Sequence, residues 1–336
     1  MAYIQPTPSY EYSDVFIVPN HSTVTSRKQV NTEVLLESPN SDLSLSIAVP
    51  VISANMDTVT GPKMAIALWE AGAIGALHRF NSISEAVEEF LEVQRAQANC
   101  FVSLGVNSNW QERASALYEA GARFFIVDIA HGHSSMMENT VKWLRSRFGR
   151  DIFIVAGNIG TSWAVDSMKD WKVDAVKVGI GGGKVCLTKN VTGVVTPMFS
   201  TVLECSQRAS KWGIPVIADG GAREYGDVAK AIGAGATAVM SGYFFAGCPE
   251  SPCVGGTTEK GEVIYRGMAS SEAAVKVRSV DTLPTPEGES IFVSKKPSAK
   301  EVVELLKGGL QSAYSYVGAT STHEFRENIT FGIRGR

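Results

Sequence analysis

The sequence predicts an α/β fold, a parallel (β/α)8 TIM barrel, and two observations lead to this prediction. Eight short apolar segments follow one another along the 336 residues, with starts typically about two dozen residues apart. Such intervals can hold a crossover helix and are too long for hairpins. The segments are also continuously apolar, which is typical of strands buried on both faces of a parallel sheet.

The expected strands comprise residues 49–54, 73–77, 101–106, 124–129, 152–156, 175–179, 215–218 and 236–241. The stretches between them have helical character. Residues 83–98 show it well, because Ile83, Val87 and Phe90 recur at helical spacing among acidic residues. Eight such units favour a closed barrel, and a doubly wound open sheet is the alternative.

Two segments interrupt the alternation of strands and helices. Residues 181–198, after the sixth strand, are rich in Gly and Thr and form a candidate catalytic loop. Residues 247–297, after the eighth strand, are rich in Gly, Pro, Ser and Glu and form a candidate flap, followed by a last helix over 298–310. Long irregular loops in compact folds are usually functional. Composition shows no boundary, so residues 1–336 are expected to form a single catalytic domain.

Composition narrows the class of protein. With 44% hydrophobic residues the chain can bury a large core, and a net charge of −3 without basic runs gives no indication of a nucleic-acid partner. The longest apolar runs have the length of strands, so no membrane partner is expected. The N-terminus lacks the features of a signal peptide, and five cysteines without a pairing pattern suggest reduced thiols in the cytoplasm. A metal site at Cys248 and Cys253 would need two further ligands.

Polar residues and glycines follow the expected strands, at the end where a barrel of this type carries its active site. Each one alone could be a helix cap or a turn residue. Together they indicate a site. The strand endings include Asn55, Asp57, His78, Arg79, Asp128, His131, Gly157, Asn158, Gly179, Asp219 and Gly242.

The run GIGGGKVCLTK, residues 179–189, contains the strongest candidate for a nucleophile. Its glycines can take backbone conformations that other residues avoid. Cys186 follows them directly, with a hydroxyl two residues later at Thr188. A thiol on a polar, glycine-rich loop is a better nucleophile than one inside an apolar strand. Cys100 and Cys205, next to Phe101 and Leu203, look like ordinary buried cysteines.

Glycines after the last two expected strands suggest a phosphate site. Gly220, Gly221 and Gly242 fall where barrels often hold a phosphate. A carboxylate such as that of Asp219 can accept both hydroxyls of a ribose, so a nucleotide is the natural ligand. The alternative for Asp219 is a helix cap.

Two further interpretations stay open at this point. His131 and His133 form an H-x-H pair that could bind a metal, although nothing nearby completes the ligand set, and a polar contact to a cofactor is the alternative. Lys177, inside the sixth expected strand, could form a Schiff base.

Several of these segments together resemble one enzyme family. The motifs are the runs SANMDT at 53–58, DIAHGHS at 128–134, AGN at 156–158, KVGIGGGKVC at 177–186, ADGG at 218–221 and RGM at 266–268. The chain is similar, from about residue 12 to 331, to the family of inosine-monophosphate dehydrogenase and GMP reductase. The segments KVC at 184–186 and HGH at 131–133 are most similar to those of the bacterial reductase subgroup.

The resemblance implies a reaction. Cys186 would attack C2 of the purine of GMP and form a covalent thioimidate. Thr188 and Glu287 would relay protons so that the 2-amino group leaves as ammonia. NADPH would then deliver a hydride to C2, releasing IMP. Covalent capture divides a hard displacement into two easier steps.

The resemblance also implies the binding residues and the assembly. Asp219 would bind the ribose. Phosphate would meet the backbone of Gly220, Gly221, Gly242 and Tyr243, and the base would lie against Gly267, Met268, Ala269, Ser270 and Gly288. NADPH would contact Ser26, Arg27, His78, Asp128, Ile129, Ala130, Asn158, Ile180 and Gly181, with Ser312 and Ser315 reaching a neighbour's cofactor in a homotetramer. Carbonyls of Gly181, Gly183 and Cys186 match a monovalent-cation site, implying K+.

Two absences favour the reductase branch of the family. Typical dehydrogenases carry a regulatory domain after the second strand, whereas here Leu77 leads through one helix to the third strand. Dehydrogenases also carry an Arg-Tyr pair in the flap, and between Met268 and Glu287 this chain has Arg278 but no tyrosine. The alternatives are an IMP dehydrogenase using NAD and a non-catalytic guanine-nucleotide-binding barrel.

Departures from the family pattern gather at the substrate loop. The usual Gly-Pro-Gly is Gly181-Gly182-Gly183, and Thr192-Gly193 is followed by VVTPM rather than another glycine. Ala269 follows Met268 where glycine or serine is common. A deoxy or modified guanine nucleotide therefore stays open as the substrate, as does NADH as the cofactor.

Overall fold

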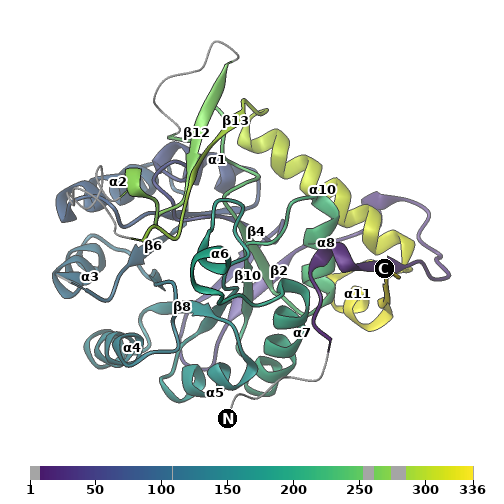
Figure 1. Cartoon of the computed structure of the whole chain (residues 1–336), viewed down its shortest axis with the longest axis horizontal. Helices are drawn as coiled ribbons and strands as arrows, with labels where there is room; N and C mark the ends of the chain where they lie inside the picture. Colours follow the sequence, from purple (N-terminus) through teal and green to yellow (C-terminus); the bar gives the residue numbers. More distant parts are fainter. Residues whose placement is uncertain (1–7, 108, 253–260, 274–284, 336) are drawn as a thin grey trace.

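The computed structural model describes residues 8–107, 109–252, 261–273 and 285–335. Its centre is a closed barrel of eight strands (Figure 1). In chain order the strands are β4 (Val51–Ser53), β5 (Ile74–Leu77), β6 (Cys100–Leu104), β7 (Phe124–Asp128), β8 (Phe153–Ile159), β9 (Ala175–Val178), β10 (Val216–Asp219) and β11 (Ala238–Ser241). Each pairs in parallel with its neighbours in the chain, and β11 closes the circle on β4. The predicted parallel (β/α)8 barrel is confirmed.

Helices surround this barrel (Figure 1). They are α1 (Pro62–Glu70), α2 (Ile83–Arg95), α3 (Trp110–Glu119), α4 (Ser135–Phe148), α5 (Ser162–Asp170), α7 (Met198–Ala209), α8 (Tyr225–Gly233), α10 (Ala299–Tyr316) and α11 (Thr322–Asn328). Local sequence sets several of their starts. Ser82 begins α2 in a capping box with Glu85, and Ser298 begins α10 in the same way with Glu301. The predicted last helix, 298–310, continues to Tyr316.

The inside of the barrel changes character along its axis. At mid-height Ile126, Val155, Ala175 and Ile217 are fully buried and pack together. Because inward positions recur every second residue, the next inward residues on three of these strands are Asp128, Lys177 and Asp219. The apolar core therefore ends in a polar layer, and this layer is the floor of the candidate site.

An antiparallel hairpin that the sequence did not predict lies at the opposite end of the barrel. It comprises β2 (Val34–Glu37) and β3 (Ser44–Ile47). Its buried residues Leu36, Leu45 and Ile47 belong to the cluster that fills the barrel interior, so the hairpin closes the amino-terminal end. The prediction considered only segments at crossover spacing and missed this short connection.

Two further antiparallel pairs were also missed. β1 (Val15–Val18) pairs with β14 (Thr330–Ile333) near the two chain ends. Inside the predicted flap, β12 (Glu262–Arg266) pairs with β13 (Ser290–Ser294), and this hairpin projects from the barrel in Figure 1. The alternation of buried Val263 and Tyr265 with more exposed neighbours is a strand signal that the Gly- and Pro-rich composition of the region masked. The candidate catalytic loop likewise contains a short helix, α6 (Thr188–Thr192).

A buried arginine fixes the loop that follows β5. Arg113 on α3 donates hydrogen bonds to the carbonyl of His78 at 3.3 Å and to the carbonyl and side chain of Asn81 at 2.9 and 2.6 Å. Glu89 on α2 lies in the same region, where burial raises the pKa of its carboxyl to about 7 despite the opposing effects of Asn81 and Arg113. Part of the stability of this corner therefore depends on a protonated carboxyl.

We expect Glu89→Gln to raise the free energy of unfolding at pH 8.5 by about 1–3 kcal/mol and to change it little at pH 5. The folded protein favours the neutral carboxyl. The stabilisation by the neutral carboxyl is thus complete below its ordinary pKa of 4.5. It is lost as the pH rises through the pKa of the folded protein, about 7. Urea denaturation at both pH values measures the effect, with the exposed Glu88→Gln as control. An equal increment at both pH values would contradict this explanation.

Candidate active site

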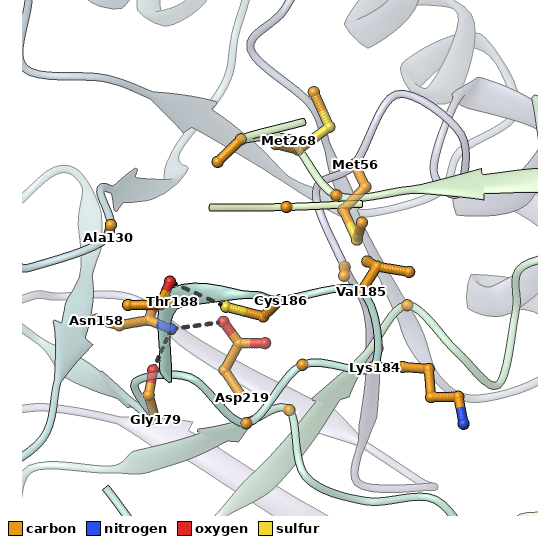
Figure 2. A pocket seen from close by; sticks show the side chains of 18 of the residues that line it. Met56, Ala130, Asn158, Gly179, Lys184, Val185, Cys186, Thr188, Asp219 and Met268 are labelled. Carbon is orange, nitrogen blue, oxygen red and sulfur yellow. Dashed lines mark hydrogen bonds between the residues drawn. The ribbon is translucent and has the colours of Figure 1, made fainter. Parts of the chain in front are cut away.

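A cavity of about 280 Å³ opens at the carboxyl ends of the barrel strands. The loop after β9 contributes Cys186 to its wall, and the end of β10 contributes Asp219. Gly242 follows β11, and Met268 and Glu287 come from the segments flanking the β12–β13 hairpin. Residues from distant parts of the chain thus meet where the sequence places the site (Figure 2).

Cys186 faces this cavity beside a hydroxyl. Its Sγ lies 3.1 Å from Thr188 Oγ1 (Figure 2), and its side chain is half-buried. Burial raises the pKa of Cys100 and of Cys205 to about 12, with Glu204 adding to the effect at Cys205. Those two thiols are therefore unreactive, and the distinction drawn from the sequence agrees with their surroundings.

A short backbone pairing joins the segment of Glu287 to the loop that bears the thiol. The Leu187 N–H donates to the carbonyl of Glu287 at 2.8 Å, and the Glu289 N–H donates to the carbonyl of Val185 at 3.0 Å. Cys186 and Gly288 form the bridge between these two bonds. The pairing places Glu287 on the cavity wall beside the loop that bears Cys186 and Thr188.

The catalytic loop packs tightly on a methionine. Met198, at the start of α7, approaches three glycines so closely that an added Cβ would lie 2.9 Å from its Sδ at Gly179, 2.8 Å from its Cγ at Gly182 and 2.5 Å from its Cγ at Gly221. Gly182 and Met198 both belong to the departures noted in the sequence. They contact each other, so the side chain of Met198 occupies space that any residue larger than glycine at 182 would need.

The floor of the cavity is an ionic network. Lys177 Nζ lies 2.8 Å from Asp128 Oδ1 and also bonds to Asp219 and to the side-chain oxygen of Asn158. Burial alone would lower the pKa of Lys177, but the two carboxylates outweigh it and raise the pKa above its usual range. A permanently protonated, ion-paired amine is a poor nucleophile, so the Schiff-base interpretation is not supported.

Asp219 is held in place by its neighbours and faces the cavity. The Asn158 side-chain amide donates to Asp219 Oδ2 at 3.0 Å and to the carbonyl of Gly179 at 2.7 Å (Figure 2). The alternative reading of Asp219 as a helix cap is wrong, because Glu224 caps the following helix α8. Its carboxylate is therefore available to a ligand.

The end of the cavity formed by β10 and β11 is rich in glycine. Gly220 and Gly221 have φ of +88° and +78°, which favours glycine. Their N–H groups donate to the carbonyls of Met240 at 3.3 Å and Gly182 at 2.9 Å. A phosphate contact by these two amides would have to replace those bonds. The sequence predicts that these amides bind phosphate, whereas in the structure both already donate to backbone carbonyls.

Positive side chains that the sequence did not single out lie at the same end. Lys296 Nζ bonds to the carbonyl of Tyr243 and lies 4.3 Å from the centre of its ring, and Lys184 Nζ lies 5.8 Å from that ring. Figure 2 shows Lys184 directed away from Cys186. Tyr265 also lines the cavity, beside Gly242. Because these residues come from separate segments, only the folded chain brings them together.

The opposite wall comes from the segments flanking the hairpin. Gly267, Met268, Ala269 and Gly288 line the cavity. Ser270 is fully buried behind them, where its N–H donates to the carbonyl of Gly267 at 3.0 Å. It supports the wall and does not line it. Arg278, on which the distinction from the dehydrogenases partly depends, lies outside the described residues.

The predicted cofactor residues fall into two groups. Asp128, Ile129, Ala130, Asn158 and Gly181 line the cavity, joined by Arg79 and Phe80, which were not predicted to bind the cofactor. The second group lies outside the lining and comprises Ser26, Arg27, His78, Ile180, Ser312 and Ser315.

Position in the fold explains this second group. His78 is turned back into the protein, where burial lowers its pKa to about 4 and its Nδ1 accepts the Phe80 N–H at 3.2 Å. Ser26 caps the short helix η2 (Arg27–Gln29), which packs against α10, the helix that bears Ser312 and Ser315. These four residues thus lie together beside α10, and their predicted role stays a prediction.

Metal binding by side chains finds no support in the residues that the structure describes. His133 Nε2 lies 3.0 Å from Ser167 Oγ, and the rings of His131 and His133 are 6.5 Å apart. Within the described ranges no group of three His, Cys, Asp or Glu side chains is placed to hold an ion. Cys248 is buried, and Cys253 lies outside the described residues. No described helix is long and apolar enough to cross a membrane.

Comparisons with known proteins agree with this arrangement. Residues 9–335 match the family model of the IMP dehydrogenase / GMP reductase domain. The chain is 36% identical to the GMP reductase of Bacillus subtilis, over 96% of this chain and 95% of that protein. It is 34% identical to the inosine-5'-monophosphate dehydrogenase of Cryptosporidium parvum, over 96% of this chain and 93% of that protein.

A solved structure extends the similarity to three dimensions. A cysteine-to-alanine variant of GMP reductase from Trypanosoma brucei, in complex with guanosine 5'-monophosphate, superposes with a TM-score of 0.89 at 28% identity. The match covers 98% of this chain and 96% of that one. The similarity therefore includes the barrel together with its loops.

The contact between Gly182 and Met198 predicts strong coupling. We expect Gly182→Ala to lower the free energy of unfolding by about 1–3 kcal/mol, since the added methyl overpacks against Met198. Combining it with Met198→Ala should remove most of this penalty in a double-mutant cycle measured by urea denaturation. Gly226→Ala is the control, because a methyl there meets open space. Strictly additive effects at residues 182 and 198 would refute the contact.

Proposed function

The chain belongs to the IMP dehydrogenase / GMP reductase family, and we propose that it reduces GMP to IMP with NADPH and releases ammonia. The observation that supports this most strongly is the meeting of three groups. Cys186 Sγ lies 3.1 Å from Thr188 Oγ1, and the pairing of Leu187 with Glu287 brings a carboxylate to the same wall. A thiol, a hydroxyl and a carboxylate provide a nucleophile and a path for protons.

In the proposed first step the Cys186 thiolate adds to C2 of GMP. The electron pair of the ring C=N bond moves onto nitrogen, which takes a proton. Once protonated, the 2-amino group leaves as ammonia with the C–N bonding pair. The ring nitrogen releases its proton and returns its electron pair, so the C=N bond re-forms and the carbon stays bound to sulfur as a thioimidate. An amino group is a poor leaving group until it is protonated, so a proton donor at this position is essential.

Thr188 and Glu287 would supply and remove these protons. The Thr188 hydroxyl is close enough to take the proton of the Cys186 thiol and to pass it on. Glu287 lines the cavity from the opposite segment and would deliver a proton to the departing amine. NADPH, when bound, supplies a hydride to C2, after which the C–S bond breaks and the Cys186 thiolate is restored.

Substrate binding would use the floor and the glycine-rich end of the cavity. Asp219, held by Asn158, would accept the ribose hydroxyls. Phosphate would lie toward Gly242 and Tyr243, near the ammonium of Lys296. A phosphate dianion near a lysine is favourable, so a nucleoside monophosphate fits this end better than a nucleoside does.

The proposed cofactor side is the wall formed by Asp128, Ile129 and Ala130. Ile129 and Ala130 offer an apolar surface to a nicotinamide ring, and Arg79 adds a positive charge at the same wall. Asn158 lies between this wall and Asp219. These residues fit a dinucleotide that approaches C2 from the side away from the phosphate end.

A monovalent cation such as K+ would use the carbonyls of Gly181, Gly183 and Cys186. The carbonyl of Gly183 accepts the Cys186 N–H at 3.2 Å, which leaves its second lone pair for an ion. Bound there, a cation would stiffen the loop below the nucleophile. We further propose a cytoplasmic homotetramer, in which Ser312 and Ser315 reach the cofactor of a neighbouring subunit.

A second candidate is oxidation of IMP with NAD. The similarity to the Cryptosporidium parvum dehydrogenase favours it, since both reactions can start with attack of Cys186 at C2. The lack of a tyrosine between Met268 and Glu287 weighs against it. A non-catalytic barrel that binds guanine nucleotides is the third possibility.

We expect the protein to oxidise NADPH only when GMP is present, forming one ammonia and one IMP for each NADPH consumed. Absorbance at the NADPH band and an ammonia assay, recorded together, measure both. Cys186→Ala should abolish turnover and keep GMP binding, because the ribose and phosphate contacts lie on β10 and β11. Faster formation of xanthosine monophosphate from IMP and NAD would favour the dehydrogenase, and inactivity in both assays the non-catalytic barrel.

Glu287→Gln should separate the two halves of the reaction. If Glu287 only relays protons for the departing amine, ammonia release should fall about 10²–10⁴-fold. Exchange of label between the cofactor and IMP should persist, because that half-reaction needs no leaving amine. The exposed neighbour Glu289→Gln is the matched control. Loss of both exchange and deamination in a folded variant that still binds GMP would give Glu287 another role.

A further inference from the structure

A buried lysine lies at the centre of the polar floor. Lys177 is 1% exposed and comes from β9, between the strands that bear its partners. Its Nζ lies 2.8 Å from Asp128 Oδ1 at the end of β7 and also bonds to Asp219 Oδ2 at the end of β10. One ammonium therefore joins two carboxylates from opposite sides of the cavity.

Asn158 completes this network. Its side-chain oxygen accepts a hydrogen bond from Lys177, and its amide donates to Asp219 at 3.0 Å. The Asn55 amide donates to Asp128 Oδ2 at 3.2 Å. Asn158 and Asn55 thus each orient a carboxylate that Lys177 also holds.

The positions of the charges indicate a functional network. All three residues line the cavity, but the side chain of Lys177 is 2% exposed, whereas those of Asp128 and Asp219 are 24% and 20% exposed. A buried ion pair is a weak source of stability, since desolvation offsets much of the attraction. At Gly157 an added Cβ would lie 2.6 Å from Lys177 Cβ, so the neighbouring strand leaves room for this side chain only by using glycine.

The cations near Asp128 also affect the ionisation of its carboxyl. Burial would raise the pKa of Asp128, but Lys177 and then Arg79 outweigh it and lower the pKa below its usual range. Lys177 is the cation that both carboxylates share, and Arg79, after β5, is the other cation acting on Asp128. Without Lys177, two partly buried carboxylates would repel each other and compete for one proton.

We infer that Lys177 is a positioning residue that orients Asp219 for the substrate ribose and Asp128 for the cofactor side through a single buried ammonium. This inference rests on the proposed function, which assigns those two ligands. Lys177 lies at the floor of the cavity but is 1% exposed, so it offers a ligand almost no surface of its own. Its effect on binding passes through the two carboxylates that line the cavity.

The test compares Lys177→Met with Lys230→Met. Lys230, on α8, also bonds a carboxylate, Asp227 at 3.1 Å, and a carbonyl, that of Tyr12 at 2.8 Å, but it does not line the cavity. The dissociation constant of GMP is measured by calorimetry on both folded variants and on the wild type, from pH 5.5 to 8.5. Binding of NADP+ to each GMP complex is measured in the same way.

Lys177→Met should weaken GMP binding by about 10- to 100-fold at neutral pH, the range seen when a partner that orients a binding group is lost. The ratio of its dissociation constant to that of the wild type should rise as the pH falls. The carboxylate pair then retains a proton and Asp219 loses acceptor capacity, while titration of the GMP phosphate cancels in the ratio. NADP+ binding should weaken as well, and Lys230→Met should change none of these values.

A folded Lys177→Met protein with GMP affinity within about twofold of the wild type and a flat ratio would overturn the inference. An equal loss in Lys230→Met would also overturn it, since that outcome reflects general destabilisation. Should Lys177→Met fail to fold, the charge-balanced Lys177→Met/Asp128→Asn variant replaces it. A wild-type affinity of that variant for GMP would also overturn the inference. Failure of the wild type to bind GMP would instead refute the proposed function.

Discussion

Two backbone hydrogen bonds join the loop after β9 to the segment before β13, and the proposed catalytic groups depend on this junction. The bonds join Leu187 to Glu287 and Glu289 to Val185, across about one hundred residues of sequence. Neither segment has a long regular element of its own at this point. The pairing holds Glu287 in the cavity wall formed with the loop of Cys186 and Thr188, and the proposed proton route depends on it.

The floor and this pairing have different physical origins. Asp128, Lys177 and Asp219 are attached to strands that pair with their neighbours on both sides, so their positions follow from the barrel. The loop residues depend on glycine conformations and on packing against Met198. In the proposed mechanism, binding thus rests on the barrel strands, whereas the covalent step rests on loop segments outside them.

Much of this arrangement could be predicted from the sequence, and the reason is burial. Barrel strands are covered on both faces, so they appear as continuous apolar runs, and all eight were found within a few residues of their observed bounds. Polar residues directly after such runs, Asp128 and Asp219 among them, must lie at one end of the barrel. Cys186 and Thr188 could be predicted as neighbours because two residues in one glycine-rich loop stay close in any conformation.

The rest could not be predicted, because it depends on side-chain direction and on distant contacts. The sequence offered Lys177 as a Schiff-base candidate, and its ion pairs with Asp128 and Asp219 became visible only in the structure. His78 follows a strand as a cofactor residue would, yet its Nδ1 accepts the Phe80 N–H and it lies outside the cavity lining. The hairpins β2–β3 and β12–β13 were missed since their strands are covered on one face and lack the continuous apolar pattern.

The departures at residues 182 and 198 illustrate how the loop can vary while the floor stays fixed. Taken singly, a glycine in place of proline loosens a loop, and larger residues in the segment that ends at Met198 crowd it. In the folded chain Met198 fills the space beside Gly182, so the loop keeps its packing against Gly179 and Gly221. The two departures therefore meet in one contact, in which the absence of a side chain at Gly182 leaves room for Met198.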